Sequence, residues 1–106
     1  MSRFSRIDVL NEIYKVGIIP VFYNDSLEVS KKIIDACFDG GARVIEFTNR
    51  GDNAYRIFSD LIIYYAQANP DVILGVGSVV DPATGALFIS SGANFVVGSV
   101  FNPDLA

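Results

Sequence analysis

The stretch RVIEFTNR, residues 43–50, alternates between two kinds of side chain in a way that is typical of a β-strand. The strand would present two faces: Ile45 and Phe47 on one, and Val44, Glu46, Thr48 and Arg50 on the other. A carboxylate in the middle of an apolar strand is costly to bury unless it is paired, hydrogen-bonded or used in chemistry. Glu46 is therefore the first candidate for a functional group.

Helices and strands are predicted to alternate on both sides of this stretch. Apolar residues recur at helical spacing in four segments, and short apolar runs separate these segments. The expected helices cover residues 5–16, from 25 or 26 to 38, from 52 or 53 to before Pro70, and 81–91; the expected strands cover residues 18–23, 43–50, 72–79 and 95–99. Asn102 and Pro103 resemble the start of a further helix that is not completed. Repeated βα units predict a parallel sheet with right-handed crossovers.

The composition is that of one small globular domain. The chain has 106 residues, of which 51% are hydrophobic and 19% are charged. The formal net charge of −4 argues against nucleic acid or an anionic membrane as a partner. No apolar run approaches the roughly 18 to 20 residues of a membrane span, and no signal peptide is evident, so we expect a cytoplasmic protein.

Histidine and cysteine usage excludes several kinds of site. The chain has no histidine, which excludes a Ser-His-Asp or Cys-His arrangement. Its single cysteine, Cys37, cannot form an internal disulfide and would be the only soft ligand for zinc. A zinc site is therefore not expected. We also expect no other metal and no cofactor.

Two architectures fit repeated βα units: an open doubly wound sheet and part of a (β/α)₈ barrel. Polar residues favour the barrel, because Glu46, Thr48 and Arg50 approach the carboxyl end of their strand, where barrel enzymes place their sites. Ser78 and Ser99 fall at the ends of the third and fourth strands. A complete barrel needs about 250 residues. We therefore expect a truncated chain that forms about half of one barrel, with an N-terminal helix and four strands in a single domain over residues 1–106.

Motifs on the two central strands resemble those of a known enzyme family. IEFTNR at residues 45–50 and GVGSV at residues 75–79 are similar to the second and third barrel strands of the 2-keto-3-deoxy-6-phosphogluconate / 4-hydroxy-2-oxoglutarate aldolases. Residues 19–21 (IPV) resemble that family's first strand, residues 40–42 (GGA) its lead into the second, and residues 91–95 (SGANF) its lead into the fourth. The resemblance covers essentially all of the chain, matched to the N-terminal half of the family.

The resemblance implies a class I aldolase, which cleaves a 2-keto-4-hydroxy acid to pyruvate and an aldehyde through a lysine Schiff base. Glu46 would be the general acid and base, Arg50 and Ser78 would bind the carboxylate of the pyruvyl part, and Thr48 would be a further substrate-binding residue. A guanidinium offers two parallel donors to a carboxylate, and burial can raise the pKa of a carboxyl group toward the working pH. The family is commonly trimeric, so we expect a homo-oligomer.

The family's Schiff-base lysine lies on a later strand than this chain contains. The lysines here are Lys15, Lys31 and Lys32, and all three fall on predicted helices. A Schiff-base lysine must be desolvated or lie beside another cation within the site, and none of the three is placed for that. We therefore expect the chain alone to be catalytically inactive. Whether the preferred substrate carries a phosphate is left open.

Other interpretations also stay open from the sequence. Glu46 could be a structural carboxylate that Thr48, Arg50 or backbone donors satisfy. The chain could be a non-catalytic half-barrel module that associates with itself or with another chain, or the N-terminal half of another phosphate-handling barrel enzyme. The glycines of GVG at residues 75–77 lack the third glycine of a dinucleotide fingerprint, because position 80 is valine, so nucleotide binding is not expected.

Overall fold

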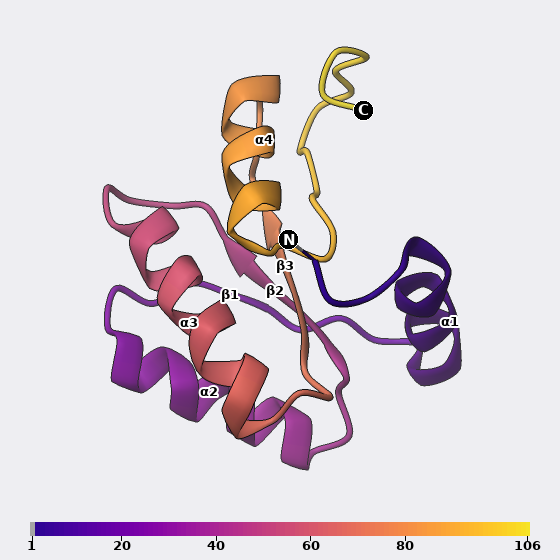
Figure 1. Cartoon of the computed structure of the whole chain (residues 1–106), viewed down its shortest axis with the longest axis vertical. Helices are drawn as coiled ribbons and strands as arrows, with labels where there is room; N and C mark the ends of the chain where they lie inside the picture. Colours follow the sequence, from indigo (N-terminus) through magenta and orange to yellow (C-terminus); the bar gives the residue numbers. More distant parts are fainter. Residues whose placement is uncertain (1) are drawn as a thin grey trace.

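Helices and strands alternate along the computed structural model, which describes residues 2–106 (Figure 1). The elements are, in chain order, α1 (Arg6–Val16), β1 (Val21–Phe22), α2 (Leu27–Asp39), β2 (Val44–Thr48), α3 (Ala54–Ala68), β3 (Ile73–Gly77) and α4 (Pro82–Ser91). The three strands form one parallel sheet in the order β1-β2-β3. The predicted α/β class with a parallel sheet is confirmed.

Short polar residues and glycines set the ends of α1 and α4. The Ser5 hydroxyl accepts a hydrogen bond from the backbone N–H three residues on at 3.1 Å, and Gly17 ends α1 in the left-handed conformation with φ of 79°. The Asp81 carboxylate accepts from the backbone N–H of Thr84 at 2.8 Å, and Gly92 ends α4. These signals are local in the sequence, which explains why both helices end where they are predicted to end.

Helices lie on both sides of the sheet. Figure 1 shows α2 and α3 side by side, with the strands between them and α1. The main core cluster, to which α2, α3 and α4 contribute, includes four strand side chains: Ile45, Phe47, Leu74 and Val76. A smaller cluster on the opposite face joins Val9 of α1 to Val44 and Ile73, with Phe95 packed against it. Successive residues of β2 fall in different clusters, so the predicted alternation is confirmed for residues 44–47. β2 ends at Thr48, before Arg50.

The predicted fourth strand, residues 95–99, is wrong for the described structure. This segment runs beside β3 but forms only an isolated bridge, between Val76 and Val96. Backbone hydrogen bonds still hold it there: Val76 N–H donates to Phe95 O at 3.1 Å, and Val97 N–H donates to Val76 O at 2.8 Å. Among residues 2–106 no strand pairs with its outer edge. The segment therefore lacks the second ladder that would hold it as an inner strand.

The first strand is shorter than the predicted residues 18–23. Pro20 has no N–H and cannot donate to the ladder, although its carbonyl accepts from the backbone N–H of Glu46 at 2.9 Å. On the other side, the Asn24 side chain accepts from the backbone N–H of Ser26 at 2.9 Å and begins the turn into α2. The strand is confined between these two features.

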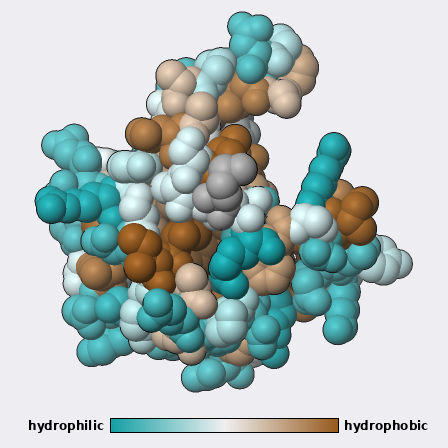
Figure 2. All heavy atoms as spheres, viewed as in Figure 1, coloured by the Kyte–Doolittle hydropathy of each residue, from teal (hydrophilic) through white to brown (hydrophobic). Residues whose placement is uncertain are grey.

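The surface of the molecule is mixed in polarity. Figure 2 shows apolar atoms beside hydrophilic ones on one face. Exposed large apolar side chains on α1 and the segment that follows it include Ile7, Leu10, Ile18 and Val21. In the described part of the chain, no helix has the length and apolar character needed to cross a membrane.

Candidate active site

Glu46 lies in the middle of β2, on the face of the sheet that carries the smaller cluster. Its Cα is in register with Val21 of β1 and with Gly75 of β3. Val44 and Thr48, which share this face of β2, are buried, whereas Glu46 is half-buried. The strand therefore holds its one carboxylate at the boundary between core and solvent.

The two glycines of β3 make room for larger side chains from neighbouring elements. A Cβ atom at Gly77 would overlap the carboxylate of Glu46, and a Cβ atom at Gly75 would overlap the ring of Phe95. The Glu46 carboxylate thus lies against the backbone of Gly77, the last residue of β3. Glycine within a strand marks the close approach of another group. The two glycines can be read from the sequence, but the groups that approach them cannot. Sequence analysis therefore does not identify Phe95 as a residue near the site.

The Glu46 carboxylate has no partner among residues 2–106. Neither Thr48, nor Arg50, nor a backbone N–H donates a hydrogen bond to it. Burial raises the pKa of Glu46 above its ordinary value, because the charged form loses solvation. Structural carboxylates are normally held by donors, so this geometry does not support a purely structural role. It suits a group that accepts and returns a proton.

Arg50 and Ser78 lie at the same end of the sheet as this carboxylate. Thr48 is in register with Gly77, and the backbone N–H of Asn49 donates to Gly77 O at 2.8 Å, which holds the ends of β2 and β3 together. Ser78 directly follows Gly77, and Arg50 directly follows Asn49; both residues are exposed. The carboxyl ends of two neighbouring strands therefore form a rim that carries all four predicted site residues.

Ser78 has an unusual backbone conformation at this rim. Its φ is 60°, and it is the only residue other than glycine with a positive φ in the described part of the chain. This conformation is costly for a residue that has a Cβ, and such residues concentrate at functional sites. Ser99, the other polar residue predicted near the rim, is exposed and lies after the bonded part of the segment that follows α4.

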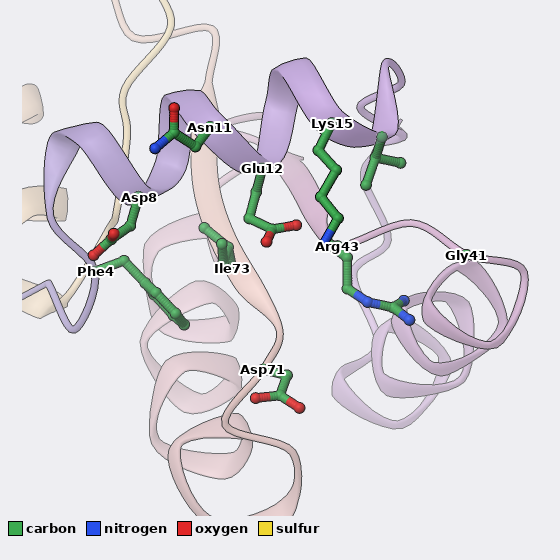
Figure 3. A pocket seen from close by; sticks show the side chains of 10 residues that line it. Phe4, Asp8, Asn11, Glu12, Lys15, Gly41, Arg43, Asp71 and Ile73 are labelled. Atoms are coloured by element: carbon green, nitrogen blue, oxygen red, sulfur yellow. The ribbon is translucent and has the colours of Figure 1, made fainter.

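A hollow of about 750 Å³ lies at the opposite end of the strands (Figure 3). Glu12 and Lys15 of α1 line it, together with Arg43 and Asp71. Arg43 and Asp71 come just before β2 and β3, so this hollow is at the amino ends of the strands. Barrel enzymes place their sites at the carboxyl ends. The hollow is therefore separate from the rim that carries Glu46.

The three lysines lie on helices, where the sequence predicts them. Lys15 is on α1 beside the hollow, and Lys32 is exposed on α2. Lys31, also on α2, forms an ion pair with Glu28 at 3.2 Å. None of the three is on a strand beside Glu46. Residues 2–106 also hold no group of three or more Cys, Asp or Glu side chains arranged to bind a metal ion.

Known proteins of similar sequence are aldolases. Residues 9–106 match the KDPG and KHG aldolase family. The chain is 34% identical over 80 residues to the 2-dehydro-3-deoxy-phosphogluconate aldolase of Dickeya dadantii (strain 3937), covering 76% of this chain and 36% of that protein. It is 30% identical over 97 residues to the protein of the same name from Treponema pallidum (strain Nichols), covering 92% of this chain and 44% of that protein. The chain thus spans less than half the length of these relatives.

Solved structures show the same fold. KDPG aldolase from Legionella pneumophila, captured with pyruvate as a covalent carbinolamine intermediate, has a TM-score of 0.73 at 30% identity, over 82% of this chain and 40% of that one. The 2-keto-3-deoxy-6-phosphogluconate aldolase of Zymomonas mobilis ZM4 has a TM-score of 0.78 at 22% identity, over 95% of this chain and 46% of that one, and bears on the fold alone. By the match over residues 9–106, the chain belongs to the KDPG and KHG aldolase family.

Proposed function

We propose that residues 1–106 form the N-terminal half of a single (β/α)₈ aldolase barrel, without a separate second domain. The sheet is parallel in the order β1-β2-β3, and residues 94–97 continue it beyond β3. The chain spans 36% and 44% of two relatives in the family. The remaining strands would pair with the outer edges of β1 and of residues 94–97, which have no strand partner in the described part of the chain.

We infer that the complete barrel is a class I aldolase, a lyase that cleaves KDPG or KHG to pyruvate and an aldehyde. The observation that carries this inference is the half-buried, unpaired Glu46 carboxylate beside Gly77, at the rim where barrel enzymes act. In this chemistry a lysine amine adds to the keto carbon, and protons must move at the carbinolamine and at the aldol hydroxyl. Glu46 is the group proposed to move them.

Arg50 and Ser78 are proposed to bind the carboxylate of the pyruvyl part, and Thr48 is proposed as a further substrate-binding residue. The Arg50 side chain has no hydrogen bond or ion pair within residues 2–106, so its donors are free to bind a planar carboxylate. The Ser78 hydroxyl would add a neutral donor from the end of the neighbouring strand. The pyruvate captured in the Legionella pneumophila relative supports a keto acid as the substrate class.

The Schiff-base lysine is proposed to come from outside residues 1–106, because Lys15, Lys31 and Lys32 all lie on helices. The 106-residue chain alone is then inactive. The chemistry uses no cofactor, since the lysine itself forms the electron sink. We propose a cytoplasmic homo-oligomer, with the trimer common in the family as the leading assembly.

Glu46→Gln in the complete barrel tests the proton-carrier role. The amide keeps the shape of the side chain but cannot titrate, so retro-aldol turnover should fall by about 10²- to 10⁴-fold. Arg50→Ala should instead mainly raise KM for keto acids, because it removes a binding group rather than the proton carrier. Turnover is measured by pyruvate release, and thermal unfolding is recorded on the same preparation.

Glu28→Gln is the matched control, since Glu28 is an exposed glutamate of α2 whose carboxylate pairs only with Lys31. It should leave turnover unchanged. A structural Glu46 would give the opposite pattern, with a lower melting temperature in Glu46→Gln and nearly intact turnover per folded molecule. Unchanged turnover in Glu46→Gln would overturn the proposed role.

A further inference from the structure

The aromatic ring of Phe95 covers the strand residue that pairs with Glu46. A Cβ atom at Gly75 would overlap three atoms of this ring, so the ring lies flat against the Gly75 backbone. Gly75 is in register with Glu46 across the β2-β3 ladder. Phe95 is half-buried and packs against the cluster of Val9, Val44 and Ile73. The ring is thus held from the α1 side of the sheet, on the face that Glu46 occupies.

The ring and the carboxylate occupy consecutive sites along β3. Phe95 covers Gly75, and the Glu46 carboxylate covers Gly77. Residues two apart on one face of a strand are separated by about 7 Å, so the ring and the carboxylate are neighbours on this face. The sequence of β3 therefore leaves two side-chain positions vacant, and an aromatic ring from one neighbour and a carboxylate from the other fill them.

We propose that Phe95 is a positioning residue for Glu46: its ring, seated on Gly75, excludes water from one side of the carboxylate, while Gly77 leaves the space in which that carboxylate lies. The inference rests on the proposed function only for the benefit of this arrangement, which is to keep the proton carrier partly shielded from water. The physical claim concerns the carboxylate itself and holds with or without turnover.

No charged group of residues 2–106 pairs with the Glu46 carboxylate. One set of charged groups lines the hollow at the amino ends of the strands: Asp8, Glu12, Lys15, Arg43 and Asp71. At the carboxyl ends, Arg50 is exposed, and both carboxylate oxygens of Asp81 accept hydrogen bonds from Thr84. β1 and β3 carry no charged residue. Burial raises the pKa of Glu46, which agrees with an apolar wall beside it.

The test is an NMR titration of the Glu46 carboxyl carbon in the 106-residue chain, without substrate. The chain has three glutamates, Glu12, Glu28 and Glu46, so ¹³C-labelled glutamate gives a readable spectrum, which Glu46→Gln assigns. Phe95→Ala should lower the pKa of Glu46, because water then reaches the carboxylate, and Phe95→Leu should lower it less. Gly75→Ala should also lower it, since the added methyl group displaces the ring.

Matched controls separate this effect from a general loss of packing. Phe22→Ala removes a half-buried aromatic side chain that contacts Phe47 in the main core cluster, and it should leave the Glu46 titration unchanged. Gly40→Ala should also leave the Glu46 titration unchanged, because a Cβ at this position would make only ordinary contacts with the carbonyls of Ala36 and Cys37. An unchanged Glu46 titration in folded Phe95→Ala and Phe95→Leu would overturn the proposal. Loss of folding in all three test variants would also overturn it, since Phe95 would then be a core residue alone.

Discussion

At the residue scale, the stability of the chain should depend on the ionisation of Glu46. Burial raises the pKa of Glu46 in the folded chain above its ordinary value of 4.5. The folded state therefore holds the proton more tightly, and the resulting stabilisation is fully present below that ordinary value and is lost as pH rises through the folded pKa. Glu46→Gln carries no such titration. Relative to the variant, the natural chain should thus be more stable at about pH 4 than at about pH 7.

Urea unfolding of both chains at the two pH values measures this difference, because titrations shared by the two proteins cancel. A natural chain that loses stability relative to Glu46→Gln on acidification would contradict it. Such a result would mean that donors hold the charged carboxylate in the folded state.

The site illustrates which residue-level features can be predicted. Glu46 stands out in the sequence because a charged side chain interrupts an apolar alternation, which is a local signal. The contact between Glu46 and Gly77 depends on the β2-β3 register, in which Glu46 pairs with Gly75. Register is a long-range property that no short motif states. The left-handed conformation of Ser78 is likewise imposed by the turn from β3 into α4, since serine has no preference for it.

At the element scale, a buried tyrosine links α2 to α3. The single proton of the Tyr65 hydroxyl lies within hydrogen-bond distance of two acceptors, Asp35 Oδ1 at 2.7 Å and the Lys31 carbonyl at 2.9 Å, and the ring is buried. Burial and the adjacent Asp35 carboxylate raise the pKa of Tyr65. Tyr65→Phe should lower the free energy of unfolding by about 1 kcal/mol, the usual net worth of such a hydrogen bond. Urea denaturation at neutral pH measures the loss.

Tyr64→Phe is the control for this prediction. Tyr64 is an exposed neighbour whose ring contacts Lys31 and Tyr65, and phenylalanine keeps those ring contacts. Loss of the Tyr64 hydroxyl should change the free energy of unfolding little. Equal stability of Tyr65→Phe and Tyr64→Phe would show that the link between the helices contributes nothing.

Helices are better anticipated than strands in this chain, for a physical reason. Ser5 and Gly17, or Asp81 and Gly92, fix helix ends through bonds within a few residues, so the sequence contains the whole signal. A strand needs a partner. The apolar run at residues 95–99 has the composition of a strand, but only the edge that faces β3 is paired. It therefore forms a single isolated bridge instead of a strand. Whether that segment forms a strand depends on pairing with other parts of the chain, which its composition does not encode.

At the scale of the whole molecule, the chain should form no covalent adduct with pyruvate. Schiff-base formation needs a lysine in a desolvated site. Lys15, Lys31 and Lys32 are all on helices, and Lys31 is engaged with Glu28. Incubation with pyruvate and borohydride followed by intact-mass measurement should leave the mass of the 106-residue chain unchanged. A stoichiometric adduct mapped to one of these lysines would refute the assignment of the reactive lysine to another part of the barrel.

The same chain should associate with itself, because one face of the sheet is only partly covered. This inner face is the one that carries Glu46, Val44 and Ile73. α1 covers part of it through Val9, yet Val21, which pairs with Glu46, is 58% exposed, and Ile18 just before it is 61% exposed. The outer edge of β1 also has no strand partner within residues 2–106. Unpaired edges and exposed apolar patches favour association. Light scattering should show an apparent mass that rises with concentration.

Single lysine substitutions locate the surface responsible for this association. Val21→Lys places a charge on the β1 edge and inner face, and it should shift the chain toward monomer. Ile63→Lys is the control, since Ile63 is 67% exposed on α3, in the helix layer that covers the other face. It should leave the association unchanged, because that layer already covers its face of the sheet. A well-folded monomer of the natural chain at high concentration would contradict the prediction, and equal effects of the two substitutions would place the contact surface outside the open side of the sheet.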